Sequence, residues 1–199
     1  MISIEDKIEK SIKSKQRGEL IFVDDFMKYG SNAAIRQALV RLAKRDVIRR
    51  VAQGIYVRPR ISKYIGEVMP TAEEVAKGIA KRDHIRMIPT GVYALNALGL
   101  STQVPMKLVF LTDSQPREIK VGRRTIKFKR TTPKNLSAKG EISALVIQAL
   151  REIGKDNYTK EEESIILDKL KKEKLKNLQH DIKLAPVWIQ KIMMKAIKE

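Results

Sequence analysis

The chain has 199 residues, of which 43% are hydrophobic and 32% charged, a composition that indicates folded domains and excludes a disordered chain. Its 41 Lys and Arg residues against 23 Asp and Glu residues give a net charge of +18, which favours a polyanionic partner. The absence of cysteine excludes a disulfide framework, a thiolate metal site and a cysteine nucleophile, and we expect no membrane span, so the sequence predicts a cytoplasmic protein.

The first 45 residues predict three helical segments. Isoleucine at every fourth position between residues 4 and 12, after the N-cap residue Ser3, predicts the first helix. A short apolar strand over 20–23 and a brief second helix over 24–29 follow. Ser31 is placed to cap a third helix with an apolar stripe that should face the core. That stripe consists of Ile35, Ala38, Leu39 and Leu42.

A basic hairpin is predicted directly after these helices. Two β-rich runs, over residues 47–52 and 55–58, are joined at Gln53-Gly54. Three helices followed by a basic hairpin are typical of a winged helix-turn-helix, here over residues 1–60. In this fold the third helix reads base edges and the hairpin lies against the DNA backbone.

The predicted DNA contacts are on the polar face of the third helix and in the hairpin. Arg, Gln and Asn side chains suit base edges in the major groove, although an ordinary solvated face is the alternative for such a helix. Because successive strand residues point to opposite faces, at least one of Arg49 and Arg50 should be structural or face solvent. The predicted contact residues are Asn32, Arg36, Gln37, Arg41 and Lys44 on the helix and Arg49, Arg50 and Arg58 in the hairpin.

Residues 61–70 are predicted to be a connector, and residues 71–199 a second domain. A capping box of Thr71 and Glu74 begins the first helix of that domain. Later periodicities predict helices over 90–98, 137–154, 159–170 and 187–197 and strands over 107–112, 117–121 and 125–130. We therefore expect an α+β fold, with an N-terminal winged helix-turn-helix and a C-terminal domain that has a small antiparallel sheet and several helices.

The positive charge is concentrated in the first two thirds of the chain. Residues 1–60 carry 14 basic and 7 acidic groups, residues 61–135 carry 14 and 6, and residues 136–199 carry 13 and 10. The last third resembles a helical surface with nearly balanced charge, so phosphate contacts are not expected there.

Several segments resemble AbiEi-like antitoxins. Those that resemble the winged-helix domain of that family are Gly30–Leu39, Arg49–Val51 and Gly54–Pro59, and those that resemble its downstream part are Thr90–Asn96, Leu98–Pro105 and Leu184–Ile189. The resemblance implies the antitoxin of an abortive-infection toxin-antitoxin pair, whose toxin is nucleotidyltransferase-like. It also implies that the antitoxin binds promoter DNA and represses its own operon. Because one winged helix reads a short half-site, we expect two copies on inverted repeats.

Two alternatives remain open. A stand-alone transcription factor would have a second domain with an apolar ligand pocket. A metal-dependent nuclease would use Asp113 and Glu118, although these carboxylates also suit an ordinary charged turn. His84 and His180 lack metal-ligand spacing, and Trp188 is predicted to pack in the core. We therefore expect no catalytic residue, metal or cofactor.

Overall fold

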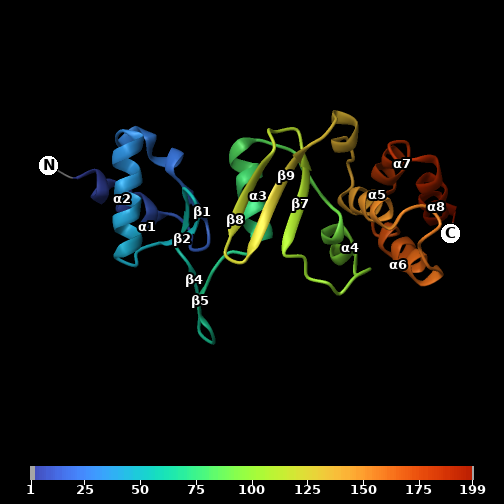
Figure 1. Ribbon diagram of the computed structural model, residues 1–199, viewed down its shortest axis with the longest axis horizontal. Coiled ribbons are helices and arrows are strands. Elements are labelled where there is room, and N and C mark those ends of the chain that lie inside the picture. The colour runs from blue at the N-terminus through green and yellow to red at the C-terminus, as the bar shows by residue number, and fades with distance from the viewer. Residues whose placement is uncertain (1–2, 199) are drawn as a thin grey trace. The chain divides into compact units, whose positions relative to one another are not determined.

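The computed structural model describes residues 3–198, which form an α+β structure, as the sequence predicts (Figure 1). The chain divides into two compact units. The first extends to residue 79 and also contains residues 119–123, and the second contains residues 80–118 and the chain from residue 124 onward. In the described residues, no helix combines the length and apolar character that crossing a membrane requires.

Three helical segments begin the first unit: α1 (Ile4–Ser14), the 3₁₀ helix η1 (Val23–Tyr29) and α2 (Asn32–Lys44). The predicted caps are present. Ser3 Oγ accepts a hydrogen bond from the backbone N–H of Asp6 at 3.1 Å, and the Asp6 carboxylate accepts one from the Ser3 N–H at 3.2 Å. Ser31 Oγ accepts from the N–H of Ala34 at 3.3 Å. These bonds satisfy N–H groups that have no partner within the helix, so each helix begins where the sequence predicts.

A three-stranded antiparallel sheet follows, in the order β1-β3-β2. Its strands are β1 (Leu20–Phe22), β2 (Arg49–Ala52) and β3 (Ile55–Val57). Gly54, at a φ of +71°, makes the tight turn between β2 and β3, a conformation that glycine adopts without a steric penalty.

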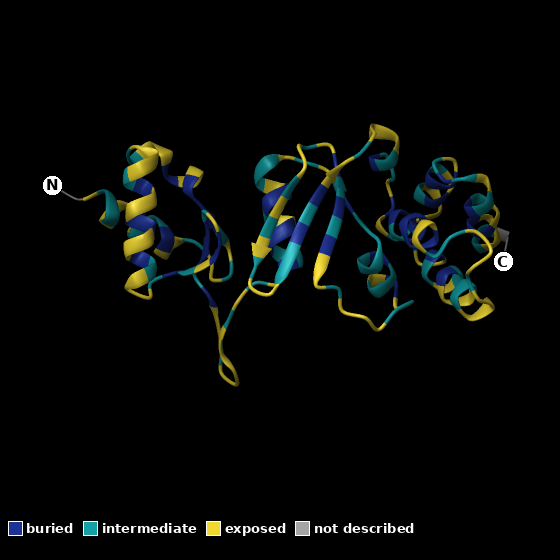
Figure 2. Ribbon diagram, in the orientation of Figure 1, coloured by how far each residue is buried: buried dark blue, intermediate teal, exposed yellow. Residues whose placement is uncertain are grey.

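The core of the first unit lies between these helices and the sheet. The predicted apolar stripe of α2 is buried, with Ile35, Leu39 and Leu42 fully inaccessible to solvent. Figure 2 shows α2 buried along one face and exposed along the other. The buried cluster contains Ile8, Ile12, Ile21, Val23, Phe26, Ile35, Ala38, Leu39, Leu42, Ile48 and Tyr56.

Residues 61–70, predicted as a connector, lie in the first unit and include regular structure. Strands β4 (Arg60–Ser62) and β5 (Gly66–Val68) pair as a two-stranded antiparallel hairpin. Helix α3 (Ala72–Asp83) follows, and its predicted capping box is present. The Thr71 N–H donates to the Glu74 carboxylate at 2.8 Å, and the Glu74 N–H donates to the Thr71 hydroxyl at 3.2 Å.

A four-stranded sheet has the order β6-β7-β9-β8. Its strands are β6 (Met87–Thr90), β7 (Lys107–Thr112), β8 (Arg117–Val121) and β9 (Arg124–Arg130). β6 and β7 are antiparallel, but β7 and β9 are parallel, so the expected antiparallel arrangement is wrong for this pair. The reason is the strand order, because β9 returns from β8 into the position next to β7. β6 was not predicted.

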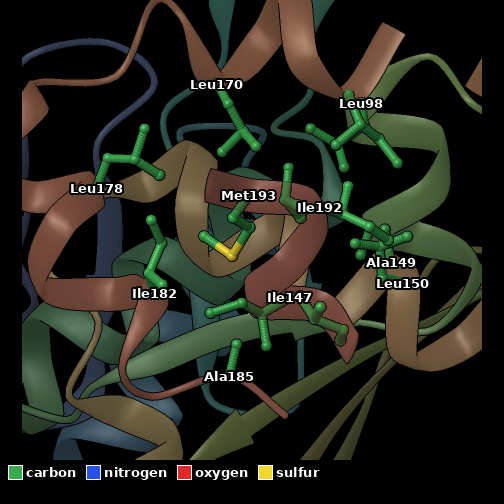
Figure 3. Close-up of a cluster of buried hydrophobic side chains, with 14 residues drawn as sticks. Leu98, Ile147, Ala149, Leu150, Leu170, Leu178, Ile182, Ala185, Ile192 and Met193 are labelled. Atoms are coloured by element: carbon green, nitrogen blue, oxygen red, sulfur yellow. The ribbon is translucent and has the colours of Figure 1, made fainter. Parts of the chain in front are cut away.

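The remaining helices lie in the second unit, and all of them except the 3₁₀ helix contribute side chains to its large apolar core. They are α4 (Val92–Leu98), the 3₁₀ helix η2 (Pro133–Leu136), α5 (Glu141–Ile153), α6 (Lys160–Leu170), α7 (Leu175–Ile182) and α8 (Val187–Lys198). Figure 3 shows side chains from α4 to α8 meeting in one cluster, in which Leu150, Leu170 and Met193 are fully buried. Trp188 is partly buried and packs against this cluster, in agreement with the prediction.

A buried carboxylate caps the start of α5. Gly140, the residue before α5, has no side chain to satisfy the helix N–H groups. The fully buried Asp181 accepts from the N–H of Lys139 at 2.9 Å and from the N–H of Gly140 at 2.8 Å, and Glu173 accepts from the N–H of Ile142 at 3.0 Å. A Cβ at position 140 would lie 2.3 Å from a Glu173 carboxylate oxygen, so glycine permits this approach.

Replacing Leu39 with Asp should unfold the first unit, because an unpaired charge would be placed in its core. We expect Leu39→Asp to lower the free energy of unfolding by at least about 4 kcal/mol. Val40→Asp is the matched control, since Val40 is the next residue of α2 and is 42% exposed. Thermal melting followed by circular dichroism compares the two. Equal melting temperatures would contradict the observed orientation of α2.

Removing the Asp181 carboxylate should destabilise the second unit. Asp181→Ala leaves the buried N–H of Gly140 and the partly buried N–H of Lys139 without this acceptor, and we expect a loss of roughly 2–4 kcal/mol in chemical denaturation. Asp168→Ala is the control, because Asp168 is exposed on α6, and its effect should stay within about 0.5 kcal/mol. Similar stabilities of the two variants would show that the cap contributes little.

Candidate nucleic-acid interface

The polar face of α2 is turned away from the core of the first unit. All five predicted contact residues of this helix are exposed. They are Asn32, Arg36, Gln37, Arg41 and Lys44. The arrangement follows from helix geometry, because the buried stripe occupies positions that recur every three or four residues and leaves the intervening positions outside.

A shallow hollow of about 370 Å³ lies on this face, and its lining also includes an exposed valine that the sequence prediction left out. The lining residues are Arg36, Gln37, Val40, Arg41 and Lys44. Sequence periodicity contained the signal for Val40, because it is four residues after Arg36 and outside the buried stripe. The hollow therefore offers several hydrogen-bond donors, three positive charges and one apolar contact.

The partners of these side chains leave most donors of the face available. Arg36 Nε donates to the Asn32 side chain one turn earlier. Arg41 lies 3.6 Å from a Glu5 carboxylate oxygen but its side chain is 63% exposed. In the described part of the chain, Gln37 and Lys44 have no side-chain hydrogen bond or ion pair. A planar guanidinium and an amide on one helix face can recognise guanine and adenine edges.

The three hairpin arginines have different environments. Arg49 forms two hydrogen bonds with the Glu67 carboxylate, at 2.9 and 3.0 Å, and an ion pair with Asp46 at 2.5 Å. The hydrogen bonding of the Arg49 guanidinium to the Glu67 carboxylate is the main cause of the raised pKa of Arg49. Arg50 is exposed, and an Arg58 guanidinium nitrogen donates to the backbone oxygen of Lys13 at 3.0 Å. Arg49 is therefore paired with two carboxylates, whereas the exposed Arg50 has a backbone partner, the oxygen of Ala52, to which its Nε donates at 3.4 Å.

The carboxylates of the nuclease alternative are engaged by other residues. Glu118 lies 2.7 Å from Lys127 Nζ and 3.4 Å from Lys107 Nζ, and these contacts hold the pKa of Glu118 below its ordinary value. Asp113 accepts a hydrogen bond from the backbone N–H of Arg86 at 3.1 Å. In residues whose placement is described, no three His, Asp or Glu side chains gather to hold a metal ion. These partners favour the charged-turn interpretation.

The second unit has an open hollow of about 570 Å³. Its lining includes Tyr158 and Trp188, whose rings stack with centroids 6.5 Å apart. The lining consists of Lys155, Asp156, Tyr158, Val187, Trp188, Lys191, Ile192 and Lys195. Its lining combines aromatic and aliphatic side chains with three lysines and one aspartate, so it decides neither for nor against the ligand-sensing alternative.

The sequence also matches a protein family over most of its length. A model described as "Family of unknown function (DUF6088)" matches residues 7–178, a range that reaches from α1 into α7. No curated protein shows a significant match. The family description names no activity, ligand or partner, so the exposed face of α2 has to be interpreted from its own residues.

Proposed function

Because the chain belongs to the DUF6088 family, whose function is unknown, we propose a function from its residues: sequence-specific binding of double-stranded DNA. In this proposal the first unit acts as a winged helix-turn-helix, with α2 as the recognition helix and the β2–β3 hairpin as the wing. Three helical segments followed by an antiparallel hairpin support this assignment.

The observation that carries the proposal is the exposed, cationic and donor-rich face of α2. Arginine can donate two hydrogen bonds to guanine, glutamine can recognise adenine, and an exposed valine can contact the methyl group of thymine. Arg36, Gln37 and Val40 supply these three kinds of contact from one hollow. A helix face that contacts only water does not need this combination of side chains. The net charge of +18 also favours a polyanionic partner such as DNA.

The wing has a positioning role in this proposal. The exposed Arg50 and the half-buried Arg58 are in or directly after strands of the hairpin, where a cation can neutralise phosphates beside the groove that α2 enters. Phosphate contacts fix the orientation of a protein on DNA but carry no sequence information. We assign Arg49 to the support of the hairpin instead, because Glu67 and Asp46 already engage its guanidinium.

We further propose that the protein is the antitoxin of a toxin-antitoxin pair in the cytoplasm. It would repress its own operon as two copies on inverted repeats and neutralise a nucleotidyltransferase-like toxin. The resemblance to AbiEi-like antitoxins supports this role. Its downstream segments, Thr90–Asn96, Leu98–Pro105 and Leu184–Ile189, lie in the second unit, which we assign to neutralisation.

Helix and wing variants should affect DNA binding in different ways. Arg36→Ala or Gln37→Ala should cost about 1–3 kcal/mol on the cognate duplex and narrow its advantage over a scrambled duplex. Arg50→Ala should weaken binding to both duplexes by a similar factor. It should also reduce the slope of log affinity against log salt concentration by about one. Lys172→Ala, an exposed lysine of the second unit, is the control. Binding titrations at several salt concentrations measure all three effects.

Two results would contradict this division of roles. If the α2 variants still prefer the cognate duplex over the scrambled one but Arg50→Ala does not, the wing and not α2 recognises the sequence. Affinity of the wild-type protein that hardly changes with salt would contradict the phosphate contacts altogether.

The two proposed activities should be separable in the full chain. We expect Arg36→Ala to lose repression of a reporter driven by its own promoter, yet to relieve growth arrest by the adjacent gene product as well as the wild type does. A reporter assay and a co-expression growth assay measure the two outcomes. If the wild-type protein relieves no arrest, the antitoxin role is wrong while DNA binding stands.

A further inference from the structure

The β4–β5 hairpin exposes apolar side chains at its tip. Tyr64 is 83% exposed and Ile65 is 76% exposed, and Ile61 on β4 is 58% exposed. The hairpin extends away from the β1–β3–β2 sheet (Figure 1). Gly66, at a φ of +74° and with no atom within 4 Å of an added Cβ, begins β5 directly after the turn at residues 63–65. Adjacent exposed apolar side chains at a projecting tip are typical of a surface that binds a partner.

The base of the hairpin is held in place. A two-stranded hairpin is marginally stable by itself, so it needs support from its surroundings. Arg49 on β2 binds the Glu67 carboxylate on β5 through two hydrogen bonds, at 2.9 and 3.0 Å. Arg60 on β4 forms an ion pair with Glu74 at 3.2 Å. The hairpin is therefore an arm with a fixed base and a free tip.

The charge of the arm favours an anionic partner. The cation of its tip is Lys63, whose Nζ lies 4.7 Å from the centre of the Tyr64 ring, whereas Arg60 at its base is paired with Glu74. The carboxylate of this segment, Glu67, is neutralised by Arg49. Each copy carries a charge of +18, so the tip of a second copy is a poor partner for this cationic surface.

We propose that this arm enters the DNA minor groove beside the site that α2 reads, with Tyr64 and Ile65 placed against the base edges. The proposal rests on the proposed DNA-binding function. Proteins that bind the minor groove combine cationic side chains with apolar residues that press between base steps. The tip offers both kinds of side chain. Tyr64 and Ile65 are the apolar residues, and the neighbouring Lys63 supplies a cation for the phosphates beside the minor groove.

The test uses a 30-base-pair duplex selected by the full chain from a random pool. In a second version, inosine replaces guanine in the flanking sequence, which removes the amino group from the minor groove and leaves the major-groove acceptors unchanged. We expect the wild-type protein to bind the inosine duplex several-fold more tightly. Tyr64→Ala/Ile65→Ala should bind the guanine duplex about tenfold more weakly and show no gain from inosine.

Matched controls separate this effect from general loss of apolar surface. Val104→Ala/Met106→Ala removes two side chains of similar exposure, 60% and 59%, from the second unit and should behave as wild type. Because the mutated tip side chains are largely solvent-exposed, melting temperatures should not change. Sedimentation of each variant reports self-association.

The outcomes decide between the proposals. Equal affinity and an equal inosine effect in the tip variant would overturn the minor-groove arm and leave DNA binding by α2 intact. Weaker binding that accompanies loss of a dimer in sedimentation would make the tip a contact between copies, which also overturns it. If the wild-type protein selects no duplex, the proposed function itself fails.

Discussion

Burial of the apolar stripe of α2 is the constraint on which the proposed interface depends. Each fully buried leucine or isoleucine of this stripe contributes about 1.5–3 kcal/mol relative to an exposed side chain. Rotating the helix by half a turn would lose that contribution and would also place Arg36 and Arg41 in the core, where an unpaired charge is costly. The outward direction of the cationic face is therefore a consequence of core packing, and α1, η1 and the small sheet serve to hold it.

Features that depend on local sequence were predictable. The caps at Ser3, Ser31 and Thr71 use side chains within three residues of the groups they satisfy, and β7, β8 and β9 begin and end close to the predicted residues. The parallel pairing of β7 with β9 was not predictable in this way, because it depends on strand order in space. The hairpin at β4 and β5 was missed because its short strands carry no periodic pattern, and their support comes from Arg49, 18 residues before Glu67.

The same distinction applies to the interface. Exposure of the α2 side chains follows from the helical period, so all five residues could be placed from sequence alone. The environments of the hairpin arginines could not, because strand alternation says that Arg49 and Arg50 face opposite sides but not what lies there. Glu67 decides the outcome, since its carboxylate engages Arg49 and leaves Arg50 exposed.

The cap of α5 also bears on the order in which the protein folds during synthesis. The N–H of Gly140 donates to the carboxylate of Asp181, which lies 41 residues later in the chain. At ordinary elongation rates a ribosome takes about 2–8 s to add that many residues. Until Asp181 has been added, the start of α5 lacks this acceptor and its apolar face lacks the partner side chains of α7 and α8. The second unit therefore completes its core only when its last helices arrive, whereas the helices and small sheet of the first unit can assemble as soon as residue 57 is available.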